Sequence, residues 1–197
     1  MGSTKRFVKR VLNPGKAKVG VKNFAGSLWD RFHGLDYAFE RCEGASLLDV
    51  ASCEGLISYE FVRRGARLVH AIERDKDRVQ FSKRLFRDVP IESNFEAGNV
   101  AISGSEFERK HSAWLLPQYD IVLFLGIYHH LERQMPVDDL NDLVRLLAER
   151  TGKYMVVRTF ENESMEATIV KAGLERVHFI EGIKDERGPL MIYARKD

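Results

Sequence analysis

The chain of 197 residues has the composition of an ordinary globular domain, with 44% hydrophobic residues, 30% charged residues and a net charge of +2. That length suits one domain with a substantial core, and the composition excludes a mostly disordered chain. Two cysteines are too few for a disulfide framework. No apolar run approaches the roughly 20 residues that cross a bilayer, and the start lacks the apolar core of a secretory signal. We therefore expect a cytoplasmic protein without a membrane span.

Residues 1–29 form a basic arm that carries seven Lys and Arg residues and no acid. Three interpretations stay open at this point: an electrostatic arm for RNA, a transit peptide, and a solvated terminus. Between residues 24 and 43, apolar residues recur at close to helical spacing, which predicts a helix or a helical pair interrupted near Gly34. We therefore divide the chain into a basic arm with a helical extension (1–43) and a main domain (44–197). Trp29, Phe32 and His33 either line a lid over a ligand or belong to the core.

The most informative segment, residues 46–58, predicts a strand, a tight turn of small residues and the start of a helix. A second apolar run, residues 68–72, ends on Glu73. This is the layout of a nucleoside-binding βαβ unit, in which backbone N–H groups of the turn approach a polar ligand and the acid accepts hydrogen bonds from ribose hydroxyls. The turn has a single glycine, Gly55, and an acid beside it, Glu54. An acid there suits a cationic ligand better than a pyrophosphate, which argues against a nucleotide-dependent oxidoreductase.

The rest of the chain alternates strand and helix patterns, which predicts an α/β protein with a mostly parallel, doubly wound, seven-stranded sheet. The final two strands have no helix between them, so they should be antiparallel neighbours. Ser164 is the expected N-cap of the last helix. The expected strands are 47–50, 68–72, 90–97, 119–125, 154–158, 174–180 and 190–194, and the expected helices are 55–64, 75–86, 137–150 and 164–172.

Residues directly after each strand are the site candidates, because ligands of open α/β sheets lie at the carboxyl ends of the strands. Asn99 follows the third strand and is either a ligand contact or a turn asparagine. Gly126, Tyr128, His129 and His130 follow the fourth strand. We expect His129 to face the site and His130 to be buried scaffold. No carboxylate or cysteine stands at ligand spacing from these histidines, so no metal site is expected.

The segment from Asp49 to Gly55, with Glu73, resembles motif I of the class I S-adenosylmethionine-dependent methyltransferases. The resemblance implies a Rossmann-like fold with an antiparallel last strand over about residues 44–195 and S-adenosylmethionine as the cofactor. It places the methionine moiety near Asp49, the ribose at Glu73 and the adenine amino group near Asn99. The cofactor residues implied are Asp49, Ala51, Gly55, Glu73, Asn99 and Gly126. His129, as a base, and Tyr128 would act on the acceptor, with Arg158 and Thr159 as further candidates; Arg158 could pair with an anionic acceptor.

The segment departs from the family pattern at Ala51 and Cys53, where glycine is usual. Alanine disfavours a positive φ, so the turn should adopt another geometry or bind more weakly. This departure keeps open a non-catalytic binding module with a degenerate motif I. The phrase from Gly126 to His130, followed by Met135 and Pro136, is distantly similar to methyltransferases of the tRNA wobble uridine. The acceptor is therefore either RNA, reached through the basic arm, or a small molecule.

Overall fold

The computed structural model describes residues 31–160, 162–182 and 188–196, so the basic arm lies outside the described residues. The strands form one sheet of seven in the order β3-β2-β1-β4-β5-β7-β6. β1 and β2 lie inside the sheet and are mostly apolar, and both are buried along their whole lengths. The strands are β1 Ser46–Val50, β2 Leu68–Glu73, β3 Glu92–Ala97, β4 Tyr119–Leu125, β5 Thr151–Arg158, β6 Leu174–Ile180 and β7 Leu190–Arg195.

The expected parallel sheet with an antiparallel strand is confirmed. β1 to β5 are parallel to one another, and β7 runs antiparallel to both β5 and β6. The strand order reverses between β1 and β4, so the carboxyl ends of these two strands open the crevice in which ligands of such sheets bind.

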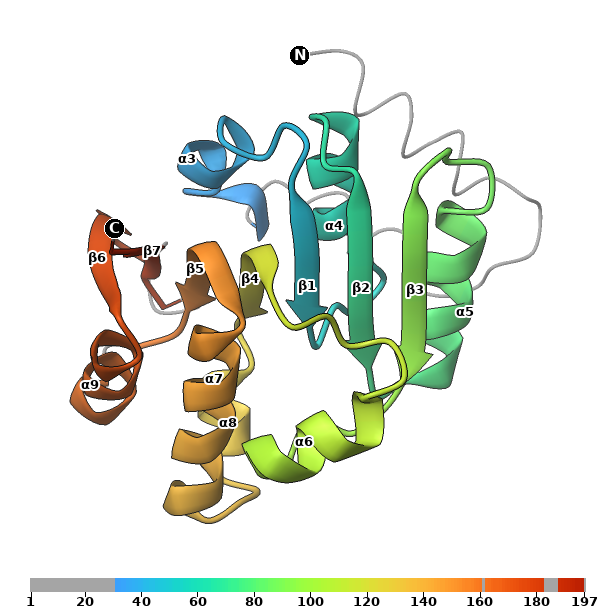
Figure 1. Ribbon diagram of the computed structural model, residues 1–197. Helices are drawn as coiled ribbons and strands as arrows, with labels where there is room; N and C mark the ends of the chain where they lie inside the picture. Colours follow the sequence, from blue (N-terminus) through green and yellow to red (C-terminus); the bar gives the residue numbers. More distant parts are fainter. Residues whose placement is uncertain (1–30, 161, 183–187, 197) are drawn as a thin grey trace.

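Helices cover both faces of the sheet (Figure 1). One face packs against α3, α4 and α5, and the other against α6, α8 and α9. The helices are α3 Asp36–Phe39, α4 Leu56–Arg63, α5 Lys76–Leu85, α6 Gly104–His111, α7 Tyr128–Leu131, α8 Val137–Glu149 and α9 Glu163–Lys171. None of the described helices is long and apolar enough to cross a membrane.

One local expectation is corrected. The last helix is capped by Asn162, whose side chain accepts the N–H of Met165 at 2.9 Å, whereas Ser164 lies inside the helix and donates to Asn141. The helical pair interrupted near Gly34 is confirmed within the described residues, because residues 31–32 are helical, Gly34 turns the chain with φ +76°, and α3 follows. The side chain of Phe39 joins the core beneath the sheet, so the part of the extension described here belongs to the same packed unit.

Candidate functional site

The turn after β1 holds three residues in the left-handed region: Ala51 at φ 63°, Cys53 at φ 51° and Gly55 at φ 70°. The backbone thus keeps the geometry that glycines adopt easily, although two positions carry side chains. Holding a side-chain-bearing residue there costs on the order of 1 kcal/mol or more. The expectation of another turn geometry is therefore wrong, because tertiary hydrogen bonds such as Ser52 N–H to the Ile72 carbonyl, at 3.0 Å, fix the turn.

Glu73 ties this turn to the end of β2. One carboxylate oxygen accepts the N–H of Cys53 and the other accepts the N–H of Asp75, both at 2.9 Å. The side chain is buried, with 7% of its residue surface exposed. Each carboxylate oxygen has a further lone pair, so the group can still accept hydrogen bonds from a bound ligand.

A cavity of about 240 Å³ lies at the carboxyl ends of β1, β2 and β4. It brings together four of the expected cofactor residues: Ala51, Glu73, Asn99 and Gly126. The remaining lining residues are Cys53, Arg74, Arg78, Val100, Ala101, Leu125, Ile127, His130, Leu131 and Gln134. The cavity therefore combines an apolar floor with a few polar groups, as small-molecule sites do.

Two expected cofactor residues do not line this cavity. Asp49 lies beneath the turn, 3% exposed, and accepts a hydrogen bond from Ser58. Burial raises the pKa of Asp49 to about 7, and the charge of Glu73 acts in the same direction. Gly55 begins α4, and a Cβ on it would meet Ser82 Oγ at 2.9 Å, so its role is the close packing of α4 on α5.

Asn99 and Gly126 both line the cavity, Asn99 after β3 and Gly126 after β4. The side-chain oxygen of Asn99 accepts the N–H of Ala101 at 3.0 Å, so Asn99 both shapes its turn and lines the cavity. Gly126 has φ +70°, and a Cβ built on it would meet nothing within 4 Å. That open position leaves room for a ligand against the backbone.

The residues after Gly126 are arranged differently from the expectation. His130, expected to be buried, is exposed and lines the cavity, whereas His129 is half-buried and its ring centroid lies 6.4 Å from that of Phe160. Tyr128 is 2% exposed and packs edge-on against Phe124 in the core. The two histidine rings lie close together, with centroids 3.9 Å apart, whereas the Tyr128 ring is buried in the core.

Partial burial lowers the pKa of His129, and the neighbouring His130 and Arg133 lower it further. Its imidazole is therefore neutral at pH 7, the state in which it can take up a proton. Burial also raises the pKa of the Tyr128 phenol to about 12, so this hydroxyl keeps its proton at neutral pH.

Arg158 does not offer its guanidinium to an acceptor. It is buried and donates to the backbone carbonyls of Arg31, at 2.9 Å, and His33. Arg158 thereby anchors the segment before α3 across the end of β5. Thr159 is also buried, and its N–H donates to the Pro189 carbonyl at 3.3 Å.

Glu54, in the turn, forms two ion pairs. Glu54 contacts Arg31 at 3.1 Å on one side and Arg78 at 3.6 Å on the other. The carboxylate of Glu54 is thus neutralised by two arginines and does not stand free for a cationic ligand. Phe32 packs edge-on against Phe39 at 6.0 Å, so this side chain belongs to the core, whereas Trp29 lies outside the described residues.

Several lining residues were not predicted as site residues, among them Arg74, Arg78 and Gln134. Arg74 follows the predicted ribose acid directly, and its position alone could have nominated it. Arg78 lies on α5 and Gln134 in the turn before α8, and only the folded arrangement brings them to the cavity.

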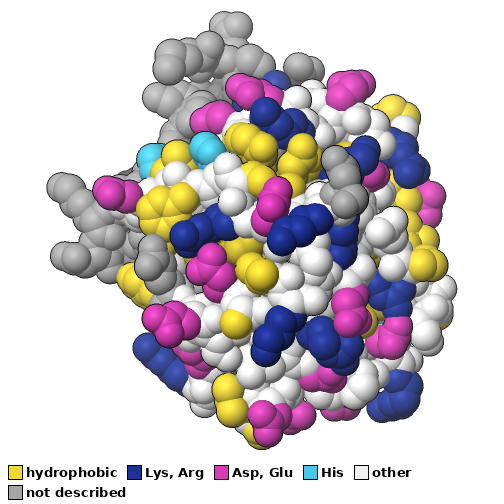
Figure 2. Space-filling model, turned by 60° about the vertical axis from the view of Figure 1, so that its left-hand side comes forward, with side chains coloured by type: hydrophobic (Ala, Val, Ile, Leu, Met, Phe, Trp, Pro, Cys, Tyr) yellow, Lys and Arg dark blue, Asp and Glu magenta, His cyan; other side chains and the backbone are white. Residues whose placement is uncertain are grey.

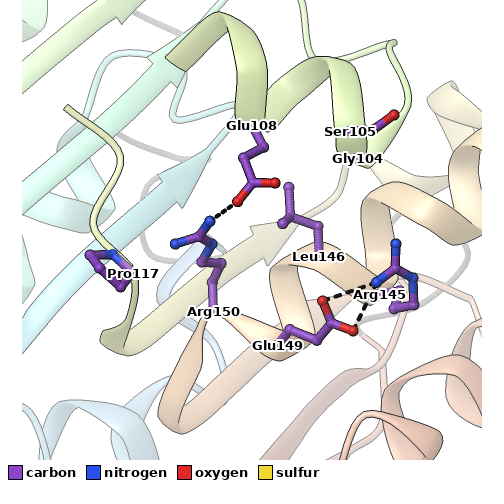
Figure 3. Close-up of a pocket in the computed structure, with 8 residues that line it drawn as sticks. All are labelled: Gly104, Ser105, Glu108, Pro117, Arg145, Leu146, Glu149 and Arg150. Atoms are coloured by element: carbon purple, nitrogen blue, oxygen red, sulfur yellow. Dashed lines mark hydrogen bonds and ion pairs between the residues drawn. The ribbon is translucent and has the colours of Figure 1, made fainter. Parts of the chain in front are cut away.

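A second cavity, of about 300 Å³, lies between α6 and α8 (Figure 3). Its charged side chains pair with one another: Arg150 with Glu108, and Arg145 with Glu149 at 2.8 Å. Pro117 and Arg150 precede β4 and β5, which places this part of the lining toward the amino ends of those strands. Internally paired charges and this position both favour the first cavity as the functional site.

Acidic and basic side chains alternate over the face of the molecule drawn in Figure 2. The described residues of that face therefore present no broad field of one sign. The described residues also contain no group of three or more His, Cys, Asp or Glu side chains that could hold a metal ion.

Comparison with solved structures identifies the fold. No protein-family profile and no curated protein sequence matches the chain. Magnesium protoporphyrin IX methyltransferase from Synechocystis with bound S-adenosylmethionine aligns at a TM-score of 0.66 and 12% identity, over 99% of this chain and 92% of that one. The same enzyme with bound S-adenosylhomocysteine aligns at a TM-score of 0.67 and 12% identity, over 98% of this chain and 95% of that one. PH1948 from Pyrococcus horikoshii, a proposed RNA methyltransferase, aligns at a TM-score of 0.61 and 15% identity, over the whole of both chains. The chain therefore has the class I methyltransferase fold, as its motifs predicted.

Proposed function

We propose that this protein is an S-adenosylmethionine-dependent methyltransferase whose cofactor occupies the cavity between Glu73, Asn99 and Gly126. The observation that carries the proposal is the rigid carboxylate of Glu73, held by the N–H groups of Cys53 and Asp75 at the wall of that cavity. A carboxylate fixed at the end of β2 is suited to the two hydroxyls of a ribose. Bound S-adenosylmethionine would supply an electrophilic methyl group on a sulfonium.

The residues present fit such a cofactor. Gly126 leaves open space in which a ligand approaches the backbone, and the left-handed turn from Ala51 to Gly55 keeps the shape expected of motif I. Asn99 and Val100 would flank the adenine, and His130 and Gln134 would form the adjoining wall. Asp49 supports the turn from beneath and adds a titratable negative charge near the site.

We assign proton removal from the acceptor to His129. Its imidazole is neutral at pH 7 and lies toward the end of β5, beside Phe160, whereas His130 lines the cofactor cavity. Methyl transfer needs an acceptor atom aligned about 3 Å from the methyl carbon and, for a protonated acceptor, a base within hydrogen-bond reach. Tyr128 supports this arrangement from the core, since its ring packs on Phe124. The acceptor itself is RNA or a small molecule.

The experiment is calorimetric titration with S-adenosylmethionine and S-adenosylhomocysteine. We expect micromolar binding to the wild type and a loss of at least about tenfold in Glu73→Gln, which keeps the side-chain shape but removes the charge that ribose hydroxyls contact. Glu92→Gln is the matched control, because Glu92 is an exposed acid at the first residue of β3. Its affinity should equal that of the wild type.

Failure of both ligands to bind the wild type would overturn the proposal and favour the non-catalytic module. That alternative depends on Ala51 and Cys53, which stand where glycine is usual in the family that the segment resembles. Equal loss in Glu73→Gln and Glu92→Gln would place the ligand elsewhere.

A further inference from the structure

Phe160 is an exposed aromatic residue at the carboxyl edge of the sheet. It lies two residues after the end of β5 and is 56% exposed, although the two residues before it, Arg158 and Thr159, are buried. A single exposed apolar side chain is common on protein surfaces, so its exposure alone indicates no site. The contacts that hold it are more informative.

Described residues on each side of Phe160 in the sequence are held by contacts. The N–H of Thr159 donates to Pro189, and Gly188 approaches so closely that a Cβ on it would lie 2.7 Å from the Phe160 nitrogen. Two residues beyond Phe160, Asn162 Nδ2 donates to Glu132 Oε1 at 2.9 Å, which joins the start of α9 to the residue after α7. These contacts hold Thr159 and Asn162, between which the exposed phenyl ring lies in the sequence.

Three neighbouring rings, those of His130, His129 and Phe160, connect the cofactor cavity with the surface. His130 lines the cavity, the ring centroids of His130 and His129 are 3.9 Å apart, and the His129 and Phe160 rings meet edge-to-face at 6.4 Å and 71°. The candidate base thus stands between the cofactor cavity and an exposed phenyl ring. An acceptor bound at His129 would therefore lie within reach of this ring.

We propose that Phe160 stacks on a planar aromatic ring of the methyl acceptor and so selects acceptors of that class. The inference rests on the proposed function and names the acceptor chemistry for the same site. A flat ring covers the phenyl group and displaces water from it, whereas a puckered, saturated ring of the same size makes poorer contact. A base of single-stranded RNA and a small aromatic metabolite share this chemistry.

The test compares planar probes with their saturated counterparts on protein saturated with S-adenosylhomocysteine. The pairs are uridine with 5,6-dihydrouridine and catechol with cyclohexane-1,2-diol, and the readout is an NMR titration with ring-labelled phenylalanine. We expect at least one planar probe to shift the Phe160 signals and to bind more tightly than its counterpart. Loss of one stacked ring corresponds to about fivefold weaker binding or more. The affinity of Phe160→Ala for the preferred planar probe should therefore fall by this factor, and Phe160→Tyr should bind the probe as the wild type does. A preference for uridine points to RNA, and a preference for catechol points to a small aromatic acceptor.

Phe179→Ala is the matched control, because Phe179 is another exposed phenylalanine, 40% exposed, on the edge strand β6. Its probe affinity should equal that of the wild type. The inference is overturned if neither planar probe is preferred, or if Phe160→Ala binds the preferred probe as the wild type does. Each variant is also titrated with S-adenosylhomocysteine alone. If this ligand fails to bind the wild type, the proposed function fails, and the probe titrations repeated without it still decide whether Phe160 stacks on planar rings.

Discussion

The hydroxyl of Ser58 donates to the buried carboxylate of Asp49 at 2.5 Å, directly beneath the turn that begins the candidate site. Among the described residues no arginine or lysine forms an ion pair with this carboxylate, which accepts a hydrogen bond from one hydroxyl, and burial raises the pKa of Asp49 to about 7. The protonated acid is therefore favoured in the folded protein at mildly acidic pH.

This predicts a pH-dependent stability difference between the wild type and Asp49→Asn. Between the ordinary carboxyl pKa of 3.8 and about 7, the folded state binds more protons than the unfolded state, so the contribution of Asp49 to stability falls as pH rises through that window. In thermal unfolding experiments, the Tm of the wild type should fall relative to the Tm of Asp49→Asn as the pH rises from 5 to 8. A loss of 1 kcal/mol corresponds to about 2–4 °C for a chain of this size. A difference that stays constant from pH 5 to pH 8 would contradict the raised pKa.

A second prediction concerns the strained turn. Ala51→Gly should stabilise the protein by about 1 kcal/mol, because glycine adopts φ 63° without steric cost while adding some disorder to the unfolded chain. Urea unfolding measures the change. Ala66→Gly, at a described alanine outside the positive-φ region, is the control and should destabilise the protein. A destabilised Ala51→Gly would mean that the methyl group contributes more than the strain costs.

Gly126→Ala should separate binding from stability. A Cβ there meets no protein atom within 4 Å, so the main cost to folding is the left-handed backbone, about 1–2 kcal/mol. The methyl group would nevertheless occupy space at the cavity wall, so S-adenosylhomocysteine affinity should fall at least about tenfold by calorimetry. Unchanged affinity would place the ligand away from Gly126.

Arg158→Met should release the segment before α3. The guanidinium donates to the carbonyls of Arg31 and His33, and hydrogen bonds to charged groups contribute about 1.5–3 kcal/mol each. Hydrogen exchange should therefore accelerate in residues 31–40 much more than in β1 and β4. Uniform acceleration across the sheet would show that Arg158 stabilises the whole fold and not this segment.

His129 and His130 should respond oppositely to alanine substitution. His129→Ala should lower turnover by about 10²–10⁴-fold and leave S-adenosylhomocysteine affinity nearly unchanged, whereas His130→Ala should weaken that affinity. Turnover is followed as transfer of a labelled methyl group to the acceptor. For the wild type, the rate should fall as pH drops and the His129 imidazole gains a proton, from a pKa below its ordinary value. Unaltered turnover in His129→Ala would remove the base assignment.

Much of the fold could be predicted from the sequence because its strands are unusually clear. The apolar run of β4 agrees with the expected bounds Tyr119–Leu125, and the absence of a helix between β6 and β7 predicted their antiparallel pairing. Helix α6, Gly104–His111, was not expected, because its sequence is largely polar and only Phe107 supplies a large apolar buried side chain.

The site was predicted only in part. The ends of the strands, and with them Glu73, can be recognised from the local sequence pattern. Ala51, Asn99 and Gly126 follow strand ends and were predicted in the same way, and all four residues line the cavity. The orientation of adjacent side chains on the four-residue α7 depends on tertiary packing, and the expectation that His130 is buried was therefore wrong. The positive φ of Cys53 depends on its hydrogen bond to Glu73, twenty residues away, which residue preference does not encode.

The place of β7 has a consequence for how the protein is made. β7 is synthesised after β6 but lies between β5 and β6, and its Arg195 donates to the carbonyls of Ala148, Thr151 and Ala172 on elements made earlier. While the ribosome is still adding residues 159–189, β5 presents an unpaired edge, and β6 has no neighbour with which to pair. Strands β1 to β4, which carry most of the candidate site, can assemble first, because domains form progressively during synthesis. The nascent chain thus completes its ligand-binding edge before its sheet, and a cofactor present during translation could stabilise the unfinished protein.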